Sequence, residues 1–162
     1  MKEVTIYTDG SARSNPDGPG GYGSVLLYVD KSGQVHTREL SQGYERTTNN
    51  RMEMMAVIAG LELLKEPCNV TIYSDSQYVV KAFMEGWIVN WQKKNWMRGK
   101  DPVKNVDLWK RMLRAMEGHD AKFVWVKGHA GNKYNEICDS LATSAADNGP
   151  WLIDEEYVKN DT

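Results

Sequence analysis

Two segments of the chain share nearly the same apolar pattern and end in the same acidic residue. Residues 4–9, VTIYTD, return as residues 70–75, VTIYSD, and each run predicts a strand that ends at Asp9 or Asp75. If these strands are parallel neighbours, about 4.8 Å apart, both carboxylates leave the sheet at the same end. Two carboxylates that close repel each other unless a proton or a cation lies between them. The repeated pattern therefore predicts a site for a divalent cation.

Two more acidic residues, Glu53 and Asp139, lie in segments with helical spacing. The residues three, four and seven positions beyond each of them are small or apolar, so both acids are expected to face a sheet rather than water. Ligands with oxygen donors alone favour Mg2+ or Mn2+ over Zn2+, which prefers His or Cys. Taken singly, each of the four acids has an ordinary alternative as a turn former, a helix cap or a solvated helix residue.

His129 lies between glycines, ten residues before Asp139. A histidine in such a loop is commonly just solvated. The same position also suits a group that transfers protons beside a metal site. Both interpretations stay open at this point.

Hydrophobic periodicity predicts the elements that must position these residues. Strands are expected at residues 4–8, 22–29, 35–43, 70–73 and 123–126, and helices at 50–64, within 76–117 in two or three pieces, and at 136–146. This order predicts an α/β fold with a mixed five-stranded sheet, in which the first three strands are antiparallel and helices cover both faces. We expect one catalytic domain over residues 1–148 and a polar, loosely held tail over residues 149–162.

The glycine-rich stretch GPGGYG, residues 18–23, matches the G-x-G-x-x-G fingerprint of dinucleotide-binding proteins. That fingerprint works where a strand leads directly into the N-terminus of a helix. Here a β-branched and apolar run follows, which predicts a second strand. The stretch is therefore expected to join two antiparallel strands and not to bind a cofactor.

Composition is typical of a globular protein: 41% of the 162 residues are hydrophobic and 26% are charged. No apolar run approaches the roughly 18 residues of a membrane span. Two cysteines do not make a disulfide framework, which favours a reducing cytoplasm.

The net charge of the chain is −2, but one segment, residues 87–111, is basic. This segment holds seven Lys and Arg residues against two Asp residues, together with four of the six tryptophans. Lysines interleaved with aromatic residues are typical of nucleic-acid binding, through phosphate neutralisation and stacking. The alternative is a helix core, which is the favoured interpretation for Trp109.

Several motifs occur together and in one order along the chain. They are TDGS at 8–11, NP at 15–16, GPGGYG at 18–23, TTNNRME at 47–53, SDSQYV at 74–79, PVKNVDLW at 102–109, WVKGHAG at 125–131, NE at 135–136 and CD at 138–139. Over roughly residues 4–148 the chain resembles type 1 ribonuclease H of the bacterial cytoplasmic kind.

The resemblance implies an endonuclease that hydrolyses the RNA strand of RNA–DNA hybrids and leaves 5′-phosphate and 3′-hydroxyl ends. It implies two Mg2+ ions, with Mn2+ as a possible substitute, bound by Asp9, Glu53, Asp75 and Asp139, and a His129 that assists proton transfer or product release. The implied substrate contacts are Asn15, Asn49, Asn50 and Gln77 in the minor groove, Thr48 and Asn105 at a DNA phosphate, and Trp87, Trp91, Lys93, Lys94, Trp96 and Arg98 in a basic protrusion over residues 87–105. We expect a cytoplasmic monomer whose partner is the hybrid duplex.

Two departures from the family pattern affect the first loop. Ser14 stands where glycine is expected, and Asp17 looks inserted. Two other functions are considered: a module that binds hybrids or structured RNA without cutting them, and a related two-metal nuclease of the integrase or resolvase type. The four acids argue against a pure binding module, because such a module has no reason to gather negative charge near phosphates.

Overall fold

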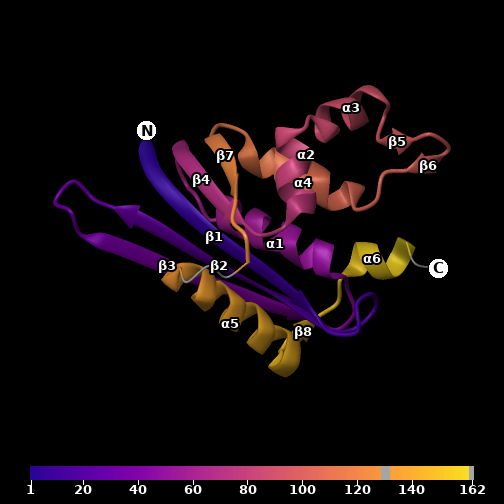
Figure 1. Ribbon diagram of the computed structural model, residues 1–162, viewed down its shortest axis with the longest axis horizontal. Coiled ribbons are helices and arrows are strands. Elements are labelled where there is room, and N and C mark those ends of the chain that lie inside the picture. The colour runs from indigo at the N-terminus through magenta and orange to yellow at the C-terminus, as the bar shows by residue number, and fades with distance from the viewer. Residues whose placement is uncertain (129–131, 161–162) are drawn as a thin grey trace.

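A mixed sheet of six strands forms the centre of the fold, in the order β7-β4-β1-β2-β3-β8 (Figure 1). The computed structural model describes residues 1–128 and 132–160. The sheet strands are β1 (Lys2–Ala12), β2 (Gly20–Val29), β3 (Val35–Tyr44), β4 (Cys68–Ser74), β7 (Asp120–Trp125) and β8 (Trp151–Leu152), while β5 (Met97–Arg98) and β6 (Asp101–Pro102) form a separate antiparallel ribbon. The helices are α1 (Asn49–Glu62), α2 (Gln77–Met84), α3 (Trp87–Lys93), α4 (Val106–Met116), α5 (Lys133–Asn148) and α6 (Glu155–Asn160).

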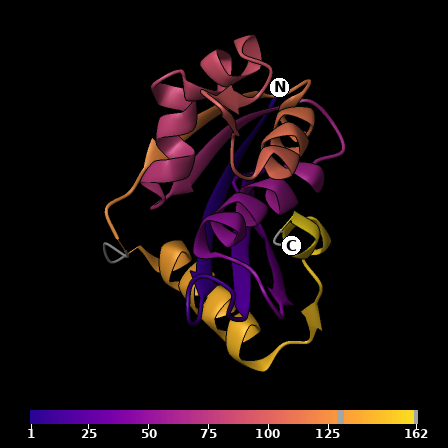
Figure 2. The same ribbon diagram turned by 90° about the vertical axis from the view of Figure 1, so that its right-hand side faces the viewer.

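Strands β1, β2 and β3 pair antiparallel, whereas β4 and β7 continue the sheet parallel to β1. Helix α1 packs on one face with α4 against it, and α5 covers β1, β2 and β3 on the other face (Figures 1 and 2). The predicted α/β class, the antiparallel first three strands and the helices on both faces are confirmed. The predicted count of five strands is wrong, because Trp151 and Leu152 add β8 parallel to β3.

Helix α1 lies at the centre of the molecule. From Arg51 to Ile58 every residue is buried, as are Gly60 and Leu61, which is typical of a helix enclosed on all sides. It contacts the sheet through β1 and β2 and the second helical layer through α4. A helix held on all sides gives its side chains fixed positions. Within the described part of the chain, no helix has both the length and the hydropathy of a membrane span.

Two glycines of residues 18–23, Gly21 and Gly23, permit the close packing of α5 on the sheet. Strand β2 already begins at Gly20, so the stretch leads into a strand as predicted and not into a helix. A Cβ on Gly23 would lie 2.4 Å from the carbonyl oxygen of Cys138 in α5. Position 23 of the strand must therefore lack a side chain for α5 to approach so closely.

The C-terminal segment packs against the domain, which corrects the expectation of a loosely held tail. Its strand β8 pairs with the end of β3, and the carbonyl of Leu152 accepts a 2.9 Å hydrogen bond from the amide of Glu45. Asp154 then forms an ion pair with buried Arg51. These partners lie about a hundred positions earlier in the chain, so no local sequence pattern in the tail predicts the contacts.

Candidate active site

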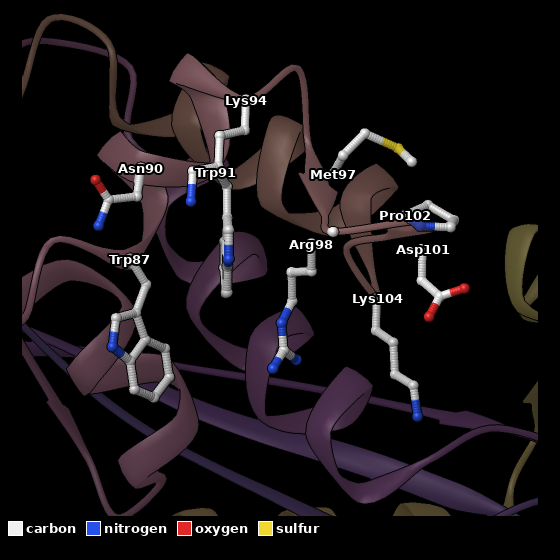
Figure 3. Close-up of a pocket in the computed structure, with 10 residues that line it drawn as sticks. Trp87, Asn90, Trp91, Lys94, Met97, Arg98, Asp101, Pro102 and Lys104 are labelled. Atoms are coloured by element: carbon white, nitrogen blue, oxygen red, sulfur yellow. The ribbon is translucent and has the colours of Figure 1, made fainter.

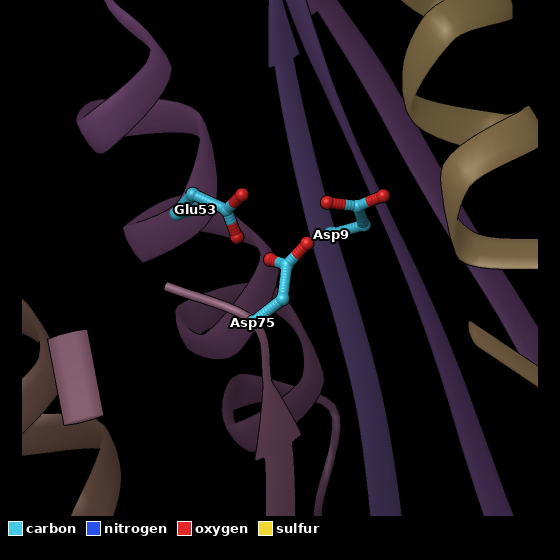
Figure 4. Close-up of side chains that lie close together, drawn as sticks. All are labelled: Asp9, Glu53 and Asp75. Carbon is cyan, nitrogen blue, oxygen red and sulfur yellow. The ribbon is translucent and has the colours of Figure 1, made fainter. Parts of the chain in front are cut away.

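Asp9 and Asp75 leave the sheet at the same end of two adjacent parallel strands. The register of β1 and β4 pairs Tyr7 with Tyr73, which places the two aspartates at matching positions two residues further on. One carboxylate oxygen from each of Asp9, Glu53 and Asp75 lies within 4.8 Å of the others (Figure 4). We call these three residues the acidic cluster. The neighbouring positions predicted from the repeated strand pattern are therefore found in the structure.

Glu53 reaches the cluster from the first turns of α1. The side chain of Thr48 caps this helix by accepting a hydrogen bond from the amide of Arg51, which fixes where the helix begins. A Cβ on Gly10 would lie 2.4 Å from the amide nitrogen of Glu53, so only a glycine in β1 permits this crossing. The close crossing brings the carboxylate of Glu53 to the strand end that carries Asp9.

The acidic cluster concentrates negative charge in a buried place. Glu53 is 4% exposed and Asp9 is 5% exposed, whereas Asp75 is partly exposed. Burial, and then the charges of Asp75 and Asp9, raise the pKa of Glu53 well above its ordinary value. The direction of this shift shows that the site disfavours a third negative charge.

Two oxygens of the cluster lack a hydrogen-bond partner. Among the described residues, nothing donates to Oε2 of Glu53 or Oδ1 of Asp75, although both atoms are buried. Buried acceptors without a donor are rare and destabilising, so each one needs an explanation. A hard divalent cation fits, because it binds carboxylate oxygens and compensates their charge.

The fourth predicted acid, Asp139, is not one of the three members of the cluster. It is half-buried on α5, next to Cys138, whose carbonyl oxygen lies against Gly23. Gly23 is the partner of Asp9 across β1 and β2, so α5 passes the side of the cluster that Asp9 occupies. His129 lies outside the described residues.

Four of the predicted substrate residues gather around the N-terminus of α1. The side-chain oxygen of Asn15 accepts a 3.1 Å hydrogen bond from the amide of Asn49, which follows the cap residue Thr48. Asn105 lies at the start of α4, and its side-chain oxygen accepts a 3.2 Å hydrogen bond from Nη1 of Arg51. We call Asn15, Thr48, Asn49 and Asn105 the polar edge.

Two other predicted substrate residues, Asn50 and Gln77, are exposed near helix starts. Asn50 is the second residue of α1 and Gln77 is the first residue of α2. Gln77 follows Asp75 by two positions, so its backbone lies beside the acidic cluster.

An open groove of about 670 Å³ lies between α3 and the β5-β6 ribbon (Figure 3). Of the predicted protrusion residues, Trp87, Trp91, Lys94 and Arg98 line it, whereas Lys93 and Trp96 do not. Trp96 packs against the hydrophobic core, as Trp87 and Trp91 also do, and Nζ of Lys110 lies 6.0 Å from its ring centre. The groove also includes Asn90, Met97, Gly99, Asp101, Pro102 and Lys104, which the sequence analysis did not assign to a site.

Comparison with known proteins gives the family. The sequence profile of RNase H matches residues 1–147. The chain belongs to the RNase H family. The curated relatives include the ribonuclease H of Lachnoclostridium phytofermentans, 64% identical over 158 residues, which cover 97% of this chain and 99% of the relative. Ribonuclease HI of a Synechocystis species is 52% identical over 157 residues, covering 96% of this chain and 95% of the relative.

Solved structures agree with this assignment. A crystal structure of LC9-RNase H1, described as a type 1 RNase H with the type 2 active-site motif, matches all of this chain and 82% of its own with a TM-score of 0.83 and 29% identity. The solution structure of the PFV RNase H domain matches 90% of this chain and 95% of its own, with a TM-score of 0.73 and 26% identity. Hydrolysis of the RNA strand of RNA–DNA hybrids is the activity of the RNase H family, so the chain is a ribonuclease.

The sequence analysis of this RNase H chain missed the role of Arg51, which is 3% exposed. Its five N–H donors make five hydrogen bonds: two to Asp154, two to Asp107 and one to Asn105, between 2.7 and 3.2 Å long. Burial alone would lower the pKa of Arg51, but the bonds to Asp107 and Asp154 raise it above the ordinary value. The available signal was an arginine within a predicted helix rich in apolar residues, because an arginine that is buried requires carboxylate partners.

Proposed function

We propose that the acidic cluster is the catalytic centre at which this chain cuts the RNA strand of an RNA–DNA hybrid. In this proposal Asp9, Glu53, Asp75 and Asp139 bind two Mg2+ ions, for which Mn2+ can substitute. The observation that carries the proposal is the meeting of three carboxylates within 4.8 Å, two of them with a buried oxygen that lacks a donor.

The protein's own contribution is to hold these oxygens in place before the substrate arrives. Bound divalent cations would supply charge stabilisation at the phosphodiester oxygens and would lower the pKa of an attacking water. Glu53 and Asp9 are fixed by the contact between α1 and β1, so binding requires little rearrangement of the site. Attack at phosphorus with departure of the 3′ oxygen would leave 5′-phosphate and 3′-hydroxyl ends. His129 is proposed to assist proton transfer or product release.

Recognition of the hybrid is assigned to the polar edge and its exposed neighbours. Asn15, Asn49, Asn50 and Gln77 carry amides that can donate to and accept from 2′-hydroxyls, the groups that distinguish RNA from DNA. Thr48 and Asn105 are proposed to bind a phosphate of the DNA strand; the hydrogen bonds from Arg51 to Asn105 and from the Asn105 amide to the hydroxyl of Tyr78 support a fixed orientation of that side chain.

The groove beside α3 is proposed to bind the DNA strand further along the duplex. Trp87 and Trp91 offer ring faces, and Lys94 and Arg98 offer positive charge in the same groove (Figure 3). Lys93 and Trp96 are retained as contacts of the same protrusion, outside the groove itself.

A cleavage assay tests the proposal. Purified protein should cut a labelled RNA–DNA hybrid in Mg2+ and leave all-RNA and all-DNA duplexes intact, and a chelator should stop the reaction. Asp9→Asn should abolish cleavage while the protein stays folded. The matched control is Asp120→Asn, which removes one exposed carboxylate at the start of β7, next to Asn69 at the start of β4.

The same assay separates the alternatives. A protein that binds the hybrid and never cuts it would support the binding module, and cleavage of all-DNA substrates would support an integrase- or resolvase-like enzyme. Full activity of Asp9→Asn would refute the assigned role of the cluster. The monomeric state and the cytoplasmic location remain predictions that gel filtration and cell fractionation would test.

A further inference from the structure

Asp154 of the C-terminal segment contacts Thr47 and Arg51, two residues that adjoin the polar edge. Its carboxylate binds Nε and Nη2 of Arg51 at 2.7 and 2.9 Å and accepts a 2.7 Å hydrogen bond from the hydroxyl of Thr47. Thr47 is fully buried and directly precedes the cap residue Thr48. Arg51 in turn binds Asn105, so Asp154 is linked to both proposed phosphate contacts through one intermediate residue each.

A second residue of the same segment, Tyr157, reaches the loop that carries Asn15. The Tyr157 hydroxyl donates a hydrogen bond to Oδ1 of Asp17. The same carboxylate faces Nη2 of Arg46 at 3.4 Å, and the ring of Tyr157 lies 5.7 Å from the guanidinium carbon of Arg46. Asp17 therefore holds the loop in place through its side chain.

The loop needs such an anchor because its backbone is unusual. Ser14 and Asp17 both have positive φ, at 50° and 79°, which non-glycine residues adopt only at a cost. Backbone hydrogen bonds join Asp17 to Thr47 and Thr47 to Gly18, at 3.0 and 3.1 Å. The loop and the segment before α1 thus form one hydrogen-bonded unit, and the C-terminal segment contacts both halves of it.

We propose that Asp154 and Tyr157 form a C-terminal clasp, a pair of positioning residues that hold the polar edge in the arrangement that binds the hybrid. The inference rests on the proposed role of the polar edge and adds a determinant of substrate affinity that lies outside the residues matched by the family profile. The clasp does not touch the acidic cluster, so it acts on binding of the hybrid and leaves the chemical step alone.

Two substitutions isolate the clasp. Tyr157→Phe removes the hydroxyl and keeps the ring over Arg46, and Asp154→Asn weakens the bond to Arg51 without changing side-chain size. Glu155→Gln is the matched control for the lost charge, because Glu155 is exposed on the same segment. All variants are assayed at a temperature at which circular dichroism shows them folded. Hybrid affinity is measured by fluorescence anisotropy in EDTA, and KM and kcat are measured in Mg2+.

We expect Kd and KM for the hybrid to rise roughly threefold to tenfold in Tyr157→Phe and Asp154→Asn, the effect of one lost hydrogen bond. The value of kcat should stay within about twofold of wild type, and Glu155→Gln should match wild type. Asp17→Ala should also raise Kd, and the double variant should bind no more weakly than Asp17→Ala alone, because Asp17→Ala already removes the hydrogen bond that Tyr157→Phe removes.

Unchanged affinity in folded Tyr157→Phe and Asp154→Asn, or a fall in kcat at constant KM, would overturn the clasp. An effect of Glu155→Gln equal to that of Asp154→Asn would also overturn it, since general charge would then explain the result. These outcomes differ from failure of the proposed function, in which the wild-type protein itself does not cut the hybrid. The anisotropy measurement does not depend on cleavage.

Discussion

Replacing Asp9 by Asn should make the metal-free protein more stable while it abolishes cleavage. The substitution removes one negative charge from a cluster whose carboxylate oxygens lie within 4.8 Å of one another. It also preserves the hydrogen bond from the amide of Gly10, 2.9 Å long, because Oδ1 of asparagine can accept it. The substitution therefore reduces the repulsion within the cluster.

The size of the gain follows from the geometry. Two full charges 4.8 Å apart repel by about 3 kcal/mol at an effective dielectric constant of about 20. This figure counts the pair Asp9 and Asp75; the pKa of Glu53 is raised by burial and by the charges of these two neighbours. We expect a gain of about 1–3 kcal/mol in the free energy of unfolding, which corresponds to roughly 2–10 °C in Tm for a chain of this length.

Urea unfolding followed by circular dichroism in EDTA measures this gain, with Asp120→Asn as the control for loss of a carboxylate. Adding Mg2+ should stabilise the wild type by about 2.7 kcal/mol at a hundred times its Kd and should stabilise Asp9→Asn much less. An Asp9→Asn protein that is less stable than wild type in EDTA would show that the carboxylates are already compensated within the protein. That result would remove the electrostatic argument for a cation at this site.

Further predictions concern the groove, the packing of α5 and the cysteines. Replacing Lys94, Arg98 and Lys104 together by Ala should weaken hybrid binding and reduce the slope of log affinity against log salt by up to about 3. The same change at the exposed residues Lys31, Arg38 and Lys65 should leave the slope unchanged. Equal slopes for the two triple variants would contradict a role for the groove. Gly23→Ala should lower the free energy of unfolding by about 1–3 kcal/mol, because its Cβ would meet the Cys138 carbonyl; unchanged stability in urea would show that α5 is not held so closely. Cys68 and Cys138, both at most 1% exposed, should react with a thiol reagent only after unfolding, and rapid labelling of the native protein would contradict their burial.

The centre of the site could be predicted because the two strands that carry Asp9 and Asp75 have the same local sequence pattern. Two strands with matching patterns pair most simply in the same register, and this places Asp9 and Asp75 at equivalent positions. The small residues after Glu53 likewise predicted a helix that approaches the sheet. For Asp139 the same argument placed the residue on an inward helix, but a pattern does not give the distance between side chains on different elements.

The ionic contacts of the C-terminal segment could not be predicted in this way. Asp154 and Arg51 are 103 positions apart, and ion pairs have no sequence period that could reveal them. Strand β8 is only two residues long, too short for an alternating pattern.

The packing that forms the core also holds the like charges of the site together. Asp9 belongs to the central strand β1, Glu53 to the enclosed helix α1, and Asp75 follows β4, which pairs with β1. Separating Glu53 from the two aspartates would require α1 to move away from Gly10, and that would expose the buried apolar residues of the helix. The burial of a single Met or Ile side chain contributes about 1.5–3 kcal/mol, as much as the repulsion estimated for one pair of charges. The fold can therefore keep the acidic cluster closed without a cation, and a bound ion would recover stability that the cluster costs.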